Sequence, residues 1–123
     1  MLLILSAGTI FWFSGNRRDN NVSQSVPKII GKVVLTIDFG NGEKRAFEGD
    51  VVENETLLDA LILTSKAGNF RYNLDERSNL AAIESFVKNS KKSWYWYLNG
   101  KKNSKSLNEI FLKADDNILI KYE

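Results

Sequence analysis

The feature that most constrains the fold is a strict two-residue alternation near the middle of the chain. Over residues 33–39 every second side chain is apolar: Val33, Leu35, Ile37 and Phe39. Successive side chains of a β-strand point to opposite faces, so this pattern predicts a strand with one buried face. Gly40-Asn41-Gly42 follows, and Asn-Gly provides the positive φ angles of a tight hairpin turn. Phe47, Gly49 and Val51 then share one face of the expected returning strand.

A helix is expected after this hairpin, beginning near Leu57. The side chains on its expected buried face are Leu58, Leu61, Ile62 and Ser65. Asn54 or Thr56 can cap its start, and Gly68 can end it. Further strands are expected over residues 80–87, 94–98 and 117–122. A hairpin, one helix and more strands indicate an α+β domain, in which one helix crosses a mixed sheet.

The chain begins with a separate hydrophobic segment. Residues 1–13 contain no charged side chain, but they are fewer than the roughly 20 that a membrane-spanning helix needs. They suit a signal or membrane-anchor segment (1–14) whose charged beginning is missing. The polar residues 15–28 then form a flexible linker, and 29–123 form the folded domain. The alternative is an N-terminal helix or strand buried against the domain.

Two residue types are absent from the sequence, and their absence restricts its chemistry. The 123 residues include no Cys and no His. Without Cys there are no iron–sulfur clusters or thiol nucleophiles, and without His the commonest general base and metal ligand are missing. The acidic pairs Asp75-Glu76 and Asp115-Asp116 lack the spacing of a calcium motif. We therefore predict that the chain is not an enzyme, and we assign no catalytic residue, metal site or cofactor.

Four segments resemble, in the same order, the transcobalamin-like C-terminal domain family (DUF4430). They are TIDFGNG at 36–42, TLLDAL at 56–61, WYWYLNG at 94–100 and LKADDNI at 112–118. One departure is Ala114-Asp115, where the family usually has Gly-Asp, so the turn there is expected to differ in shape. The resemblance implies a β-grasp (ubiquitin-like) fold and an exported or surface-attached protein.

The resemblance also bears on the ligand. In the vertebrate cobalamin carriers of this family, the domain covers a corrinoid that is held against a separate α-helical barrel. These 123 residues hold no such barrel. Cobalamin binding therefore does not follow from the fold alone.

The aromatic run Trp94–Tyr97 is the strongest candidate for a binding surface. In a strand, Trp94, Trp96 and Leu98 share one face, which we expect to pack under the helix, and the tyrosines share the other. The candidate ligand-binding residues are Trp94, Tyr95, Trp96, Tyr97 and Asn99. Two interpretations of the tyrosines stay open. They form either an aromatic platform for a ligand or a solvent-facing ladder that only stiffens the sheet.

Lysines flank this strand on both sides. Lys88, Lys91 and Lys92 precede it, and Lys101, Lys102 and Lys105 follow it. We expect the two groups at opposite ends of the strand, and therefore expect no nucleic-acid partner.

The predicted function is an extracytoplasmic, membrane-tethered or secreted, non-catalytic binding module. Its expected ligand is a small molecule such as a corrinoid, or a surface glycan. The alternative is a structural or adhesive domain that pairs with a protein partner through a sheet edge.

Overall fold

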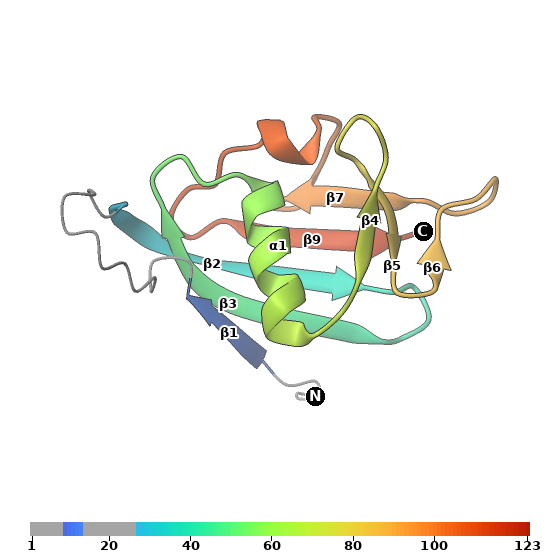
Figure 1. The fold of residues 1–123 in the computed structure, drawn as a ribbon, viewed down its shortest axis with the longest axis horizontal. Helices are drawn as coiled ribbons and strands as arrows, with labels where there is room; N and C mark the ends of the chain where they lie inside the picture. The colour runs from blue at the N-terminus through green and yellow to red at the C-terminus, as the bar shows by residue number, and fades with distance from the viewer. Residues whose placement is uncertain (1–8, 14–26) are drawn as a thin grey trace.

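A computed structural model describes residues 9–13 and 27–123. Its main sheet is mixed and six-stranded, with the order β1-β3-β2-β9-β7-β8. The strands are β1 Thr9–Phe13, β2 Ile29–Asp38, β3 Lys44–Val52, β7 Trp94–Leu98, β8 Lys101–Asn103 and β9 Asn117–Tyr122. Helix α1 (Leu57–Gly68) crosses one face of this sheet, as Figure 1 shows. This is the expected α+β architecture of the β-grasp type.

A second, smaller sheet lies on the same side of the main sheet as α1 (Figure 1). Its order is β4-β5-β6, and its strands are β4 Tyr72–Leu74, β5 Leu80–Ile83 and β6 Phe86–Val87. A short 3-10 helix, η1 (Leu107–Glu109), precedes β9.

The predicted hairpin joins β2 to β3. Asp38 pairs with Lys44 at its end, and the Gly40 N–H donates to Asp38 Oδ1 at 2.8 Å. Gly40 has a φ of 79°, and a Cβ there would lie 2.5 Å from the Tyr122 carbonyl oxygen. Glycine is therefore required at this position by both the backbone conformation and the available space.

The alternation that predicted β2 corresponds to the core of the domain. All four of its apolar side chains are buried: Val33, Leu35, Ile37 and Phe39. Leu35 lies opposite Phe47 of β3 on one side and Ile118 of β9 on the other, and both are also buried. Each such side chain contributes about 1.5–3 kcal/mol of hydrophobic stabilisation.

The helix is present, but its buried face differs from the expected one. The buried residues are Leu57, Ala60, Leu61, Thr64, Ser65 and Gly68. Leu58 and Ile62, which were expected in the core, are only half-buried. The helix turns its small residues toward the sheet, because a Cβ at Gly68 would lie 2.7 Å from the Phe47 ring.

The ends of α1 are capped by residues on either side of it. Thr56 accepts a hydrogen bond from the Asp59 N–H and Asp59 accepts one from the Thr56 N–H, which forms the capping box. Thr56 is therefore the cap, rather than Asn54. At the other end the left-handed residue is Asn69, with a φ of 55°, so Gly68 is the last helical residue and not the terminator.

The prediction of a single strand over residues 80–87 is wrong. The segment folds back on itself as β5 and β6, with Ala82 opposite Val87 and Ile83 opposite Phe86. Glu84 occupies the turn with a φ of 52°, and its carboxylate accepts the Arg71 N–H at 2.7 Å. This local hydrogen bond supports the turn, which interrupts the apolar pattern.

The turn before β9 shows how the chain accommodates Ala114-Asp115. The left-handed residue is Asp115, with a φ of 69°, and its N–H donates to the Lys32 carbonyl at 2.7 Å. Aspartate tolerates this conformation better than most residues, so Ala114 need not be glycine.

The N-terminal segment is described only in part. Thr9–Phe13 forms β1, which pairs in parallel with residues 46–50 of β3, so these residues adopt the strand of the alternative interpretation. Residues 1–8 of the expected signal or anchor segment, and 14–26 of its end and the expected linker, lie outside the described residues. Among the described residues, no helix is both long and apolar enough to cross a membrane.

Candidate functional site

Strand β7 has the predicted bounds and the predicted alternation. Trp94 and Trp96 are buried, with 2% and 6% of their surface exposed, whereas Tyr95 is 38% exposed. The strand pairs along its length with β9, while β8 pairs only with Trp96, Tyr97 and Leu98. The first half of β7 is therefore an edge of the described sheet.

The two indoles belong to the same buried core as Leu57 and Leu61 of α1, and their N–H groups bond to other segments. The Trp94 Nε1–H donates to the Phe86 carbonyl of β6 at 2.8 Å, and its ring lies 5.8 Å from that of Phe39. The Trp96 Nε1–H donates to the Lys105 carbonyl at 2.9 Å. Both indole donors are satisfied, so these side chains are held rigidly in place.

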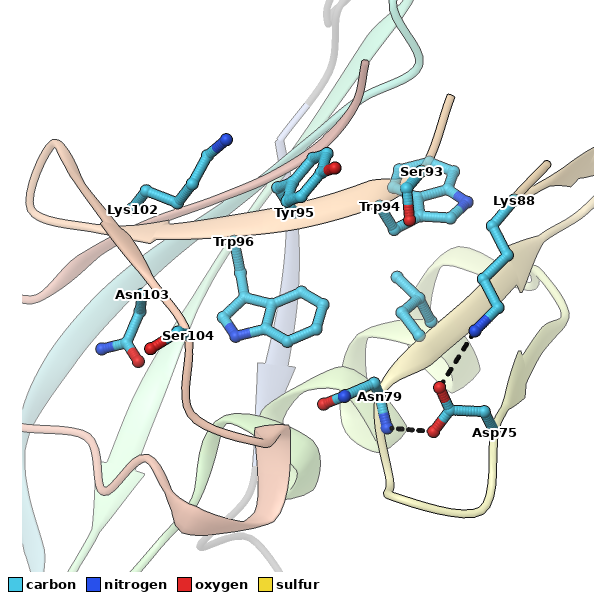
Figure 2. Close-up of a pocket in the computed structure, with 11 residues that line it drawn as sticks. Asp75, Asn79, Lys88, Ser93, Trp94, Tyr95, Trp96, Lys102, Asn103 and Ser104 are labelled. Atoms are coloured by element: carbon cyan, nitrogen blue, oxygen red, sulfur yellow. Dashed lines mark hydrogen bonds and ion pairs between the residues drawn. The ribbon is translucent and has the colours of Figure 1, made fainter. Parts of the chain in front are cut away.

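A pocket of about 430 Å³ opens beside this edge (Figure 2). Three segments line it: residues 93–96 at the start of β7, residues 102–104 after the turn, and the second sheet with its loops. The second sheet contributes Asp75, Asn79, Leu80 and Lys88. Trp94, Tyr95 and Trp96 line the pocket, whereas Tyr97 and Asn99 do not.

Asp75 organises one wall of the pocket. Its carboxylate accepts the backbone N–H groups of Arg77 at 2.8 Å and Asn79 at 3.0 Å, and it forms an ion pair with Lys88 at 3.0 Å. The hydrogen bond from Asn79, followed by the one from Lys88, holds the pKa of the Asp75 carboxyl below its usual value. The wall therefore carries an ionised but already paired acid.

Asn79 differs from its neighbours because its amide is unsatisfied. Its Oδ1 atom is buried and accepts no hydrogen bond, and its Nδ2 donates none to any described residue. Figure 2 shows the amide directed toward Trp96 and away from the Asp75 carboxylate. Buried acceptors normally have a partner, so this oxygen is an exception in the pocket wall.

The two tyrosines of β7 lie on the opposite face of the sheet and contact charged neighbours. Lys102 Nζ lies 4.0 Å from the centre of the Tyr95 ring. The Tyr97 hydroxyl donates to Glu123, which also lies 3.8 Å from each of the Lys102 and Lys121 ammonium groups. This hydrogen bond raises the pKa of Tyr97 above its ordinary value. The outer face thus carries a cross-strand aromatic and ionic cluster.

Tyr97 and Asn99, the remaining predicted residues, line a second hollow of about 650 Å³ on this outer face. Both polar atoms of the Asn99 amide already form hydrogen bonds within the chain. Nδ2 donates to Asp116 Oδ1 at 2.9 Å, and Oδ1 accepts the Asn117 N–H at 2.8 Å. The structure therefore divides the predicted site between two faces of the sheet.

One lysine from each of the two groups reaches the pocket. Lys88, from the group before β7, and Lys102, from the group after it, line the same pocket. Lys102 pairs with Tyr97 near the end of β7, and its ammonium group reaches back over the Tyr95 ring. Within the described part of the chain, no group of acidic side chains is arranged to hold a metal ion.

Several pocket residues were not anticipated from the sequence: Asp75, Asn79, Leu80, Ser93, Asn103 and Ser104. Most are ordinary loop residues. The one local signal was the Asp75-to-Asn79 spacing, in which an aspartate precedes polar residues and caps the turn that follows it.

No family model and no curated protein sequence matches the chain. Among solved structures, haptocorrin in complex with Cbi matches with a TM-score of 0.65 and 13% identity, over 85% of this chain and 28% of the haptocorrin chain. A proposed metal-binding protein from Ruminococcus gnavus ATCC 29149 matches with a TM-score of 0.56 and 10% identity, over 76% of this chain and 96% of that one. The chain thus spans about a quarter of the haptocorrin length. At these identities the likeness shows a transcobalamin-like fold.

Proposed function

We propose that this chain is a non-catalytic binding module of the transcobalamin-like C-terminal domain type (DUF4430), which holds a small polar ligand in the pocket beside β7. The ligand is a corrinoid or a surface glycan. The four resembling segments and the shared fold with haptocorrin support the family. The missing Cys and His support a non-catalytic role.

The observation that carries this proposal is the construction of the pocket. Trp94, Trp96 and Leu80 supply apolar walls, and amide and hydroxyl side chains of Asn79 and Ser104 lie around them. A concave, largely apolar site with a few fixed polar groups is the usual form of a small-molecule site. Because Trp96 and Leu80 line a hollow and not a flat surface, a small ligand is favoured over a protein partner.

The size of the pocket limits what it encloses. A volume of about 430 Å³ accommodates a sugar unit, or one edge of a corrinoid, but not a whole corrinoid. Haptocorrin is described in complex with Cbi, and the chain covers only 28% of it. A corrinoid would therefore need a second surface, whereas a glycan chain could leave the pocket through its open side.

The proposed location is extracytoplasmic, as a secreted or membrane-tethered protein. The family resemblance supports it, whereas Thr9–Phe13 of the apolar start pairs with β3 and gives no support for an anchor. Surface glycans and scavenged corrinoids are both encountered on that side of a membrane.

The proposal is tested with the full chain and three ligands: cyanocobalamin, maltotriose and adenosine monophosphate. A ligand that binds the folded state raises the melting temperature by mass action. Cyanocobalamin or maltotriose is expected to raise it, and the nucleotide is not. Absence of any shift at millimolar concentrations of the first two would contradict the small-ligand proposal.

A matched pair of variants locates the binding. Ser104 is exposed and lines the pocket, so Ser104→Trp is expected to block it and to abolish the shift. Ser85 is an exposed turn residue outside the pocket, and Ser85→Trp should leave the shift intact. Equal shifts in both variants would place binding elsewhere.

Pairing with a protein through a sheet edge is the second candidate function. The observation in its favour is the uncovered first half of β7. However, the neighbouring edge strand β8 has only three residues and carries Lys101 and Lys102, which disfavour addition of another strand. The pocket is therefore the preferred site.

A further inference from the structure

The Asn79 side chain is placed as a recognition group rather than as part of the scaffold. Its backbone N–H donates to Asp75 Oδ1 at 3.0 Å, and its carbonyl accepts the Asp75 N–H at 2.8 Å. These bonds fix the main chain while the amide makes no hydrogen bond to a described residue. Buried acceptors are normally paired, so the unpaired Oδ1 of this half-buried residue, which lines a pocket, indicates a missing partner.

The charges around the pocket indicate that this partner is neutral. Asp75 is paired with Lys88, and Lys102 lies over the Tyr95 ring and near Glu123. An ionic ligand would have to compete with these existing contacts. A neutral ligand group would leave them in place.

The amide itself specifies the geometry of the partner. Its Oδ1 accepts and its Nδ2 donates, side by side in one plane. Oδ1 is buried in the ligand-free chain, so the side chain must rotate toward the pocket when a ligand binds. A primary carboxamide, or two adjacent hydroxyls, presents the complementary pair. A carboxylate presents two acceptors and would leave Asn79 Oδ1 without a donor.

We propose that Asn79 is the specificity-determining residue of the β7 pocket and selects a neutral ligand group that carries a paired donor and acceptor. The group lies between the Asn79 amide and the Trp96 indole, to which Figure 2 shows the amide directed. This inference rests on the proposed function, because it assumes that the pocket binds a ligand.

The test uses three probes and two leucine variants of the full chain. Nicotinamide supplies a carboxamide on a flat ring, nicotinate supplies the carboxylate of the same shape, and maltotriose supplies adjacent hydroxyls. Asn79→Leu removes the amide, and Asn73→Leu makes the same change at an exposed position of β4 outside the pocket. Binding is followed by NMR through the Trp96 indole N–H signal, and stability by thermal melting.

Nicotinamide or maltotriose is expected to bind the wild-type chain at least tenfold more tightly than nicotinate. Whichever of the two binds more tightly shows whether the pocket prefers a carboxamide or a pair of adjacent hydroxyls. Asn79→Leu should weaken that probe at least tenfold, while Asn73→Leu leaves it unchanged. The melting temperature of ligand-free Asn79→Leu should equal or exceed that of the wild type, because the variant removes an unsatisfied buried acceptor.

The possible outcomes distinguish a failure of this inference from a failure of the proposed binding function. Binding that is unaffected by Asn79→Leu, or a preference for nicotinate, would overturn the role of Asn79 and leave the binding module standing. A lower melting temperature of the ligand-free Asn79→Leu variant would show a structural role and overturn the inference as well. Failure of all three probes to bind the wild-type chain would overturn this inference, and the binding module falls as well only if cyanocobalamin also leaves the melting temperature unchanged.

Discussion

Asn99 clamps the turn after β7 to Asp116 at the entrance of β9. Its Nδ2 donates to Asp116 Oδ1 at 2.9 Å, and its Oδ1 accepts the Asn117 N–H at 2.8 Å. The other Asp116 carboxylate oxygen accepts the Lys113 N–H at 2.8 Å, which closes the turn before β9. One amide thus links two turns that lie 17 residues apart in the chain.

This clamp predicts that Asn99 matters for stability more than for binding in the β7 pocket. Asn99→Gly keeps the positive φ of 52° accessible and removes the amide. We expect a loss of about 1–3 kcal/mol in the free energy of unfolding, because the buried Asp116 carboxylate loses a partner. Urea denaturation measures the loss. A variant of wild-type stability with weakened ligand binding would instead assign Asn99 to a ligand site.

The close approach of α1 to β3 predicts a large effect at Gly68. A Cβ there would lie 2.7 Å from the Phe47 ring and 2.9 Å from Arg45 Nη2, which donates to the Gly68 carbonyl at 2.6 Å. Gly68→Ala should therefore lower the free energy of unfolding by about 1–3 kcal/mol, although alanine favours helices. Chemical denaturation measures it, with Lys66→Ala at an exposed position of the same helix as the control. Stabilisation by Gly68→Ala would show that the helix can move away from the sheet.

Much of the fold could be predicted because its strands carry regular local patterns. The alternation over 33–39 corresponds to four buried side chains, and the bounds of β7 and β9 match the expected ones. The buried face of α1 could not be predicted from the positions of its apolar residues. Close contact with Phe47 selects small residues for the buried face, and that contact depends on tertiary structure.

The pocket could be predicted only in part, for a different physical reason. The aromatic run marked one wall, but the opposite wall comes from the second sheet around Asn79. That sheet forms because Glu84 turns the chain back, and residues 80–87 alone also suit one continuous strand. A site assembled from separate segments leaves no contiguous pattern in the sequence.

The Asp75 network predicts a pH dependence of stability. Its pKa is lowered in the folded state by hydrogen bonds from Asn79, Lys88 and Arg77. A lowered folded-state pKa contributes stability above the unfolded-state value of about 3.9, and this contribution is lost as the pH falls through the folded-state pKa. Asp75→Asn should therefore melt at a lower temperature than the wild type at pH 7, and the difference should shrink below about pH 4. A difference that stays constant across this range would exclude the ionised carboxylate as its origin.

The Tyr97–Glu123 hydrogen bond predicts the opposite dependence at alkaline pH. The carboxylate raises the pKa of Tyr97, so the folded state keeps this proton after the unfolded state has lost it. The resulting stability is fully present below the ordinary tyrosine pKa of about 10 and is lost as the pH rises through the folded-state value. Ultraviolet titration should show a late ionisation that Tyr97→Phe removes and Glu123→Gln shifts to lower pH. Tyr95 makes the smallest contribution to the raised pKa of Tyr97, so Tyr95→Phe should leave most of that late titration in place, and its loss in this variant would contradict the assignment.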